Sequence, residues 1–292
     1  MTTHRTALTS AHITALLFGL TGIFGALIHA SASVITLGRA GFAMLALAAF
    51  ALIQKRPIFR GLNRSVFGIF ILSGLLLAAH WVTFFIAIKV GGVAVATLGF
   101  ASFPAFIALL DIAVFRDRLH FSETILLSLV TLGLVLVTPS FGLGNQSTVG
   151  LLWGLGSGLS FALLAMTNRR AAKGVNAVQV SFWQNVIVAV VMVPFSAFDL
   201  IELRSFDWVN LALLGIFCTG LSQYLFVKSL EGLNARSAGM IISLEPVYAI
   251  ACAWWLFNEA PTYRMLAGAT LIVLAILLSS QVKPSHVKAV SH

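Results

Sequence analysis

Long apolar stretches separated by short polar connections fill almost the whole chain. Ten of them are long enough to cross a bilayer, since about 20 helical residues span the roughly 30 Å hydrocarbon core. In hydrocarbon the backbone must satisfy its own hydrogen bonds, and these runs are too uniformly apolar for barrel strands, which alternate lipid-facing and lumen-facing residues. The pattern predicts an all-α integral membrane protein with ten transmembrane helices, at 12–30, 34–53, 65–88, 93–115, 122–138, 149–168, 177–198, 208–228, 235–257 and 263–281.

The composition leaves no room for a sizeable soluble domain. Of the 292 residues 59% are hydrophobic and only 9% are charged, and the mean hydropathy is +1.00. Such values are typical of a chain whose solvent is largely lipid. We therefore expect a multi-pass protein of the cell inner (plasma) membrane, with the lipid bilayer as its partner.

The positive charges are distributed unevenly between the two sides of the predicted membrane. The net charge of +9 would suggest a nucleic-acid ligand in a soluble protein. Here fourteen of the 18 Lys and Arg residues fall on the side of the N-terminus, and four, Arg39, Lys89, Arg204 and Arg264, fall on the other. Because cytoplasmic loops carry the excess of Lys and Arg, this bias predicts both termini in the cytoplasm and no nucleic-acid partner.

The chain contains an internal repeat. Residues 80–121 align without a gap with residues 222–263, so that Phe84 meets Phe226 and Pro104 meets Pro246. The alignment predicts two repeats of five helices, 1–145 and 146–292. Because five is an odd number, the second repeat enters the membrane from the opposite side and is inverted relative to the first. Inverted repeats are the architecture by which many secondary transporters alternate access to a site at the membrane midplane.

Short motifs in both repeats resemble a known family. The segment SLEPVYA at 243–249, and its counterpart ASFPAF at 101–106 with FRDRL at 115–119, resemble the EamA-type members of the drug/metabolite transporter superfamily. Within that superfamily the chain looks most like the YddG-type exporters. The resemblance implies ten helices around a central cavity, and an inner-membrane secondary transporter that exports neutral, especially aromatic, amino acids by alternating access.

Candidate substrate-binding residues of the first repeat are the aromatic and polar side chains near the midplane. His80 and Trp81 lie a little past the middle of the third predicted helix, and Phe84 follows one turn after His80 on the same face. Phe100 and Phe103 lie three residues apart in the fourth helix and are adjacent on its surface. For His80, a hydrogen bond to a neighbouring helix is as good an interpretation as substrate contact.

The second repeat offers Trp153, Gln184, Tyr224 and Tyr248. An uncharged amide such as that of Gln184 recognises a zwitterion without the cost of a buried charge. For Trp153, anchoring at the membrane interface competes with a role at the mouth of the cavity. A cavity of this kind predicts that several neutral amino acids are carried, that aromatic side chains stack on Trp81 and Phe103, and that strongly charged amino acids are excluded.

Two prolines and one acid complete the set of candidates. Pro104 and Pro246 are predicted to lie inside helices, where proline produces a kink or a hinge that moves during transport. Glu245 precedes Pro246 near the middle of a predicted helix, where an unpaired charge costs about 2.5–3.5 kcal/mol. It must face protein or water, and three roles stay open: capping of the kink, carriage of a proton, and contact with a substrate amino group.

Several chemistries are missing from the sequence. There is no phosphate-binding GxxxxGK[ST] loop, no HExxH or GxSxG motif and no set of metal ligands at usable spacing, so we expect no catalytic residues, cofactor or metal. Alternatives to amino-acid export are export of another small neutral metabolite, a membrane scaffold, and an intramembrane enzyme with His80 and Glu245 as acid and base. The fifth and tenth helices carry no aromatic or charged core residue, so they are expected to face lipid or a second protomer of a homo-oligomer.

Overall fold

The computed structural model describes residues 4–115, 121–137, 144–171, 176–229, 233, 241 and 244–279. These residues form helices and their connections and contain no strand. The helices are α1 (His4–Leu27), α2 (Ala32–Ile53), α3 (Arg64–Phe100), α4 (Phe103–Phe115), α5 (Phe121–Val137), α6 (Gln146–Ala171), α7 (Ala177–Ser196), η1 (Asp199–Glu202), α8 (Ser205–Gly215), the π-helical turn η2 (Ile216–Leu221), α9 (Ser222–Ser229), α11 (Glu245–Phe257) and α12 (Tyr263–Ser279).

Six of the described helices are long and apolar enough to cross a membrane by their length and composition. They cover His4–Leu27, Ala32–Ile53, Arg64–Phe100, Gln146–Asn168, Val178–Ser196 and Ser205–Phe226, and a shorter apolar helix covers Tyr263–Ala275. The chain is therefore a multi-pass membrane protein by its helices. Most of the first part of the predicted ninth span, 235–243, lies outside the described residues.

The predicted fourth span, 93–115, is not one straight helix. Its first part continues α3 across Gly92, whose positive φ of 82° interrupts the helix at a conformation that glycine adopts readily. The Glu259 side chain, from the connection between α11 and α12, accepts a hydrogen bond from the backbone N–H of Val93 just after this break. A second break follows at Ala101 and Ser102, and α4 begins at Phe103.

The two prolines lie at helix starts, so the prediction that they lie inside helices is wrong. Pro104 is the second residue of α4, and Pro246 is the second residue of α11. Proline is tolerated in the first helical turn because its missing N–H has no partner there in any case. Each proline therefore lies in the first turn of its helix, and neither α4 nor α11 is kinked at its proline.

The described helices of the two halves correspond to each other. Helix α4 runs from 103 to 115 and α11 from 245 to 257, while α5 runs from 121 to 137 and α12 from 263 to 279, so every bound is shifted by 142 residues. The contacts correspond as well: α1 packs against α9 and α11, α6 packs against α3 and α4, and α2–α7 and α5–α12 are contacting pairs. Exchanging the two halves reproduces this pattern, as a pseudo-two-fold axis requires.

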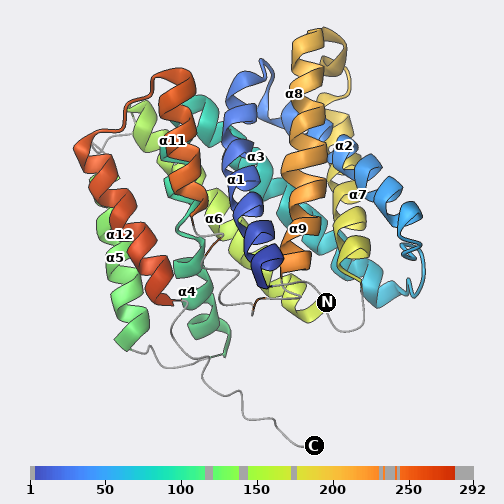
Figure 1. Ribbon diagram of the computed structural model, residues 1–292, viewed down its shortest axis with the longest axis horizontal. Coiled ribbons are helices and arrows are strands. Elements are labelled where there is room, and N and C mark those ends of the chain that lie inside the picture. Colours follow the sequence, from blue (N-terminus) through green and yellow to red (C-terminus); the bar gives the residue numbers. More distant parts are fainter. Residues whose placement is uncertain are drawn as a thin grey trace, which may run out of the picture.

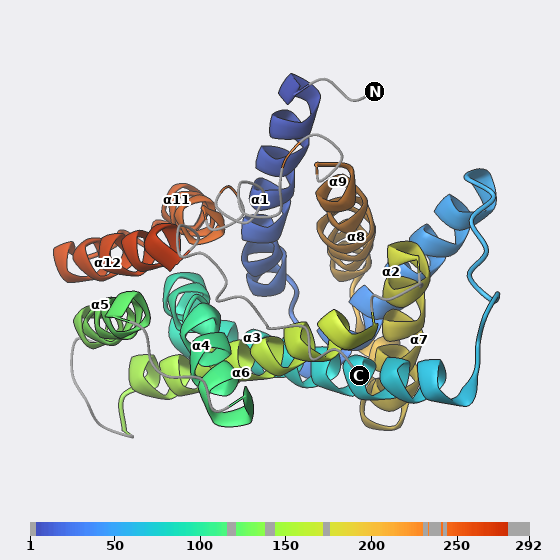
Figure 2. The same cartoon turned by 90° about the horizontal axis from the view of Figure 1, so that it is seen from below.

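Figure 1 shows how these pairs are arranged. Helices α4, α5, α11 and α12 form one group, α2, α7, α8 and α9 form another, and α1, α3 and α6 lie between them. The view from below separates α1 from α3 and α6 and shows α6 running along α3 for much of its length (Figure 2). A region bordered by α1, α3, α6, α9 and α11 is thereby left in the middle of the molecule.

Glycines allow close contact between α3 and α6. A Cβ added to Gly150 would lie 2.6 Å from the Gly91 Cα, and one added to Gly154 would lie 3.1 Å from the Gly99 Cα. No side chain separates the two backbones at these points, so the helices approach each other closely. Gly133 of α5 approaches α12 in the same way, so the fifth and last predicted helices pack against each other on one side.

Candidate functional site

A cavity of about 270 Å³ lies in this middle region and receives side chains from both halves of the chain. Sites for drug-sized ligands measure about 300–1,000 Å³, so the size suits one small molecule. From the first half the cavity is lined by Phe18, Thr21, Arg39, Leu77, His80, Trp81, Phe84, Phe100, Ala101 and Phe103, and from the second by Phe161, Cys218, Thr219, Gln223, Phe226, Glu245 and Pro246.

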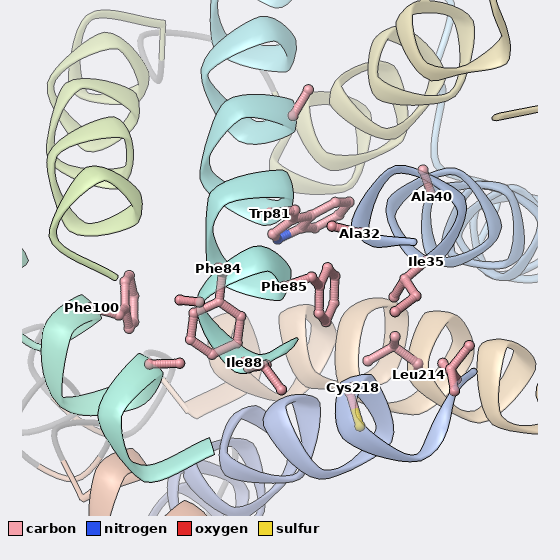
Figure 3. Packing of buried hydrophobic residues seen from close by; sticks show 14 of the residues in the cluster. Ala32, Ile35, Ala40, Trp81, Phe84, Phe85, Ile88, Phe100, Leu214 and Cys218 are labelled. Atoms are coloured by element: carbon pink, nitrogen blue, oxygen red, sulfur yellow. The ribbon is translucent and has the colours of Figure 1, made fainter. Parts of the chain in front are cut away.

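Aromatic rings form one wall of the cavity. The Phe100 ring is central, with its centroid 5.3 Å from that of Phe103, 5.3 Å from that of Phe161 and 5.8 Å from that of Phe84. Such distances are those of favourable stacked and edge-to-face pairs. Figure 3 shows Phe84 and Phe85 side by side on α3, with Phe100 on the side of α6 and Trp81 on the side of α2.

His80 belongs to this wall and is fixed by hydrogen bonds to α6. The Ser157 hydroxyl donates to the His80 carbonyl oxygen at 3.1 Å, and His80 Nδ1 lies 2.7 Å from Ser157 Oγ and 3.3 Å from the Ser157 carbonyl oxygen. Because the serine proton is used and a carbonyl can only accept, the imidazole proton is assigned to Nδ1. His80 therefore bonds a neighbouring helix, as one of its two interpretations predicts, and it also lines the cavity, while its contact with a substrate stays a prediction.

Arg39 is the largest departure from the sequence prediction. It was assigned to the external side of the membrane, but it lies about two helical turns, roughly 10 Å, into α2 and is only 5% exposed. Its Nε donates to Thr219 Oγ1 at 2.7 Å, and its guanidinium carbon lies 4.0 Å from the centroid of the Trp81 ring. The external group of predicted positive charges is thus reduced to Lys89, Arg204 and Arg264.

Thr219 is held in place by an irregular turn. It lies in the π-helical turn η2 between α8 and α9, and its own hydroxyl donates to the Leu214 carbonyl oxygen at 3.1 Å. Single π-helical turns occur frequently at functional sites because they displace the side chains that follow. Gly215, just before the turn, allows α8 to approach the Arg39 backbone closely.

The second half supplies the polar acceptors of the cavity. Glu245 is half-buried at the first residue of α11, and its carboxylate makes no hydrogen bond or ion pair among the described residues. The ion pairs of the described chain join Asp207 to Arg204 and His29 and do not include Arg39 or Glu245. Gln223 Oε1 is buried and also lacks a hydrogen-bond partner within the described chain.

The structure brings together most of the predicted site residues. His80, Trp81, Phe84, Phe100, Phe103, Glu245 and Pro246 all line the cavity. Pro104 does not, because it follows Phe103 around the first turn of α4. Four predicted binding residues, Trp153, Gln184, Tyr224 and Tyr248, are also missing from the lining.

Each of these four side chains has another environment. Trp153 is 40% exposed, whereas its neighbour Gly154 lies on the face of α6 that contacts α3. Gln184 is buried and donates to Asn168 Oδ1 at 2.8 Å, which joins α7 to α6.

The two tyrosines are likewise engaged elsewhere. Tyr224 stacks on Phe50 with ring centroids 4.6 Å apart, while its neighbour Gln223 takes the position facing the cavity. Tyr248 lies on the face of α11 that packs against Gly19 of α1, and its hydroxyl is 3.3 Å from His12 Nδ1.

Sequence reasoning missed Arg39, Phe161, Thr219 and Gln223 as lining residues. A signal for Gln223 was present, because the repeat alignment pairs it with Trp81, just as it pairs Phe226 with Phe84. The structure places all four of these repeat-related residues on the cavity. No comparable signal exists for Arg39 or Phe161, whose directions depend on how α2 and α6 are rotated about their axes.

A multi-pass helical protein with a buried cavity shared between two corresponding halves has the architecture of a membrane transporter. The comparisons with known proteins agree with this class. Residues 5–138 and 148–281 each match the EamA-like transporter family, and the chain belongs to that family.

Individual relatives are distant but cover much of the chain. An uncharacterized transporter of Archaeoglobus fulgidus is 23% identical over 91% of this chain and 93% of its own length. An S-adenosylmethionine uptake transporter of Rickettsia bellii is 24% identical over 71% of this chain and 70% of its own. One crystal structure aligns over 94% of this chain and 96% of its own with a TM-score of 0.64 and 17% identity, which shows a shared fold.

Proposed function

We propose that this chain is an inner-membrane secondary transporter that exports neutral amino acids, aromatic ones above all, by alternating access. The observation that carries the proposal is the 270 Å³ cavity with its wall of aromatic rings, lined from both halves of the chain. Apolar and aromatic contacts hold a substrate side chain strongly enough for selection and weakly enough for release. The relatives and the family are transporters, and we propose no catalytic step.

The proposed architecture is two inverted repeats of five transmembrane helices, 1–145 and 146–292, with both termini in the cytoplasm. The shifted helix bounds and the exchangeable contacts support the repeat relation. The break at Ala101 and Ser102 before α4 and the start of α11 at the equivalent position of the second half support it further, because helix ends at equivalent positions of two repeats commonly flank the substrate site of a transporter. Pro104 and Pro246, in the first turns of α4 and α11, are the proposed hinges.

Fusion of a reporter enzyme that is active only outside the cytoplasm tests the orientation. A fusion after residue 145 is expected to give activity and a fusion after residue 173 none, because the charge bias places the first site outside and the second inside. Activity is measured in intact cells and normalised to the amount of fusion protein. The reverse pattern would invert the orientation and with it the proposed direction of transport.

Counterflow in proteoliposomes tests the substrate. Vesicles loaded with unlabelled L-phenylalanine are expected to accumulate external labelled L-phenylalanine, and protein-free vesicles are not. In competition, methionine and aromatic amino acids should reduce the uptake, whereas lysine and glutamate should not. S-adenosylmethionine, which carries an α-amino acid group and an aromatic adenine, is included because the Rickettsia relative is named for its uptake. Counterflow with S-adenosylmethionine but not phenylalanine would replace the proposed substrate.

A further inference from the structure

We propose that Arg39 and Glu245, with Gln223, form a head-group site that binds the α-carboxylate and α-ammonium of an amino-acid zwitterion. The inference rests on the proposed transport of amino acids and adds what recognises them. The sequence assigned Arg39 to the external side and left contact with a substrate amino group as one of three roles for Glu245, whereas the structure places both side chains on the cavity that the aromatic rings line. An ionisable group at this depth marks a functional site, because hydrocarbon strongly disfavours it elsewhere.

The guanidinium of Arg39 is oriented by its neighbours in a way that leaves it available to bind an anion. One of its nitrogens, Nε, is engaged by Thr219, and its plane lies over Trp81 at 4.0 Å. These contacts orient the side chain without using its two terminal nitrogens, for which the described residues supply no hydrogen-bond acceptor. Two parallel N–H groups from an arginine fit the two oxygens of a carboxylate, which gives both affinity and direction.

The acceptors for an ammonium group lie on the same cavity. The Glu245 carboxylate has no partner among the described residues, and Gln223 Oε1 is a buried acceptor whose hydrogen bond is missing. A buried acceptor without a partner destabilises the empty site, so a donor that arrives with the substrate relieves this cost. A primary ammonium carries three donors, enough for both side chains.

Arg39 and Glu245 carry opposite charges on the same cavity but form no direct ion pair. A zwitterion presents opposite charges to both at once, so the complex contains no uncompensated buried charge. When the substrate leaves, the attraction between Arg39 and Glu245 remains, and the empty site is not left with two isolated ions. This mutual compensation lets a charged site release its ligand.

The Phe103, Phe100 and Phe161 rings then receive the side chain of the amino acid. The repeat alignment places Phe103 and Glu245 at equivalent positions of α4 and α11, and Trp81 and Gln223 at equivalent positions of α3 and α9. In both of these repeat-related pairs, the first half of the chain supplies an aromatic residue and the second half supplies a polar residue. The cavity is thus symmetric in backbone but not in chemistry, which fixes one orientation of the substrate.

Ligand-induced shifts of the melting temperature of the purified full-length protein test the proposal, because a ligand that binds the folded state raises Tm by an amount that grows with the logarithm of its concentration relative to its Kd. The probes are L-phenylalanine, phenethylamine, which lacks the carboxylate, and 3-phenylpropionate, which lacks the ammonium. We expect both analogues to bind the wild-type protein about 10- to 100-fold more weakly than phenylalanine, since each loses charge-assisted hydrogen bonds.

Two variants assign the two ends of the site. Arg39→Gln is expected to weaken the binding of phenylalanine about 10- to 100-fold and to leave the binding of phenethylamine unchanged. Glu245→Gln should weaken the binding of phenylalanine and leave the binding of 3-phenylpropionate unchanged. Arg64→Gln, the same change at an exposed arginine at the start of α3, is the control and should change neither. The melting transition itself reports folding, and Arg39→Lys, which keeps the charge but not the planar fork, replaces Arg39→Gln if that variant shows no cooperative transition.

The head-group site would be overturned if Arg39→Gln lost the same affinity for phenylalanine and for phenethylamine, or if the analogues bound the wild-type protein as tightly as phenylalanine.

Titrations with L-methionine and S-adenosylmethionine test the head-group site separately from the preference for aromatic substrates. If either shifts Tm in an Arg39-dependent way while phenylalanine does not, the head-group site stands and the aromatic preference falls. If none of the three amino acids shifts Tm, the head-group site is wrong whatever apolar molecule is carried.

Discussion

Replacement of Gly150 by leucine is expected to abolish the folded protein, while the same replacement of Gly156 on the same helix leaves it intact. A Cβ at position 150 would lie 2.6 Å from the Gly91 Cα and 2.8 Å from its N, so the obstacle is backbone that no rotamer change can move. A Cβ at position 156 meets nothing within 4 Å. Overpacking by a few methylenes already costs about 1–3 kcal/mol of a total stability of about 5–15 kcal/mol.

Size-exclusion chromatography of the detergent-solubilised variants checks this result. Gly150→Leu should give aggregate, Gly150→Ala a monodisperse protein with a lower Tm, and Gly156→Leu the wild-type profile. The graded series ties the effect to volume at the contact between α3 and α6. A monodisperse Gly150→Leu protein with an unchanged Tm would show that the two helices are not held at this distance.

Phe103→Ala is expected to raise the apparent KM for phenylalanine about 10-fold, or about 1.4 kcal/mol, and to change that for threonine less than about 2-fold. The Phe103 ring stacks on Phe100 at 5.3 Å and meets Phe161 at 5.1 Å, on the wall that we assign to the substrate side chain. Its loss removes apolar contact that a phenyl group uses and a short polar side chain does not.

Competition kinetics in proteoliposomes measure both constants, and Phe195→Ala, at a 69% exposed position of α7, is the matched control.

Trp81→Ala is expected to behave differently from Phe103→Ala. Because the Arg39 guanidinium lies over the Trp81 ring, removal of that ring should raise the apparent KM for phenylalanine and for threonine alike. Equal losses for Phe103→Ala would make that residue a packing element instead of a selectivity determinant.

The contrast between these two aromatic residues shows where sequence reasoning ends. Helix positions followed from apolar length, and the clustering of His80, Phe84, Phe100 and Phe103 followed from their depth and helical spacing. The residues that contact each ring could not be predicted from the sequence, because they depend on the rotation of helices that lie far apart in the chain. Trp81 and Phe103 were therefore treated alike, although both line the cavity and only Trp81 also contacts the Arg39 guanidinium.

Local errors had local causes. Pro104 and Pro246 were assigned to helix interiors because the apolar runs continue through them, and hydropathy does not distinguish a continuous helix from a broken one. Arg39 was assigned to the outer surface because it lies near the end of an apolar run, yet the protein supplies Thr219 and Trp81 to accommodate it. Tyr224 and Gln223 are adjacent in sequence, and only the contact of Tyr224 with Phe50 decides which of them faces the cavity.

The glycine contact between α3 and α6 bears on leakage. A transporter that uses or maintains an ion gradient must prevent protons and water from leaking across the membrane beside its substrate. Where Gly91 meets Gly150 and Gly99 meets Gly154, backbone touches backbone, and there is no side chain whose rotation could open a gap for a chain of waters. At these two points the contact between α3 and α6 therefore leaves no passage for water, whatever the conformations of the neighbouring side chains.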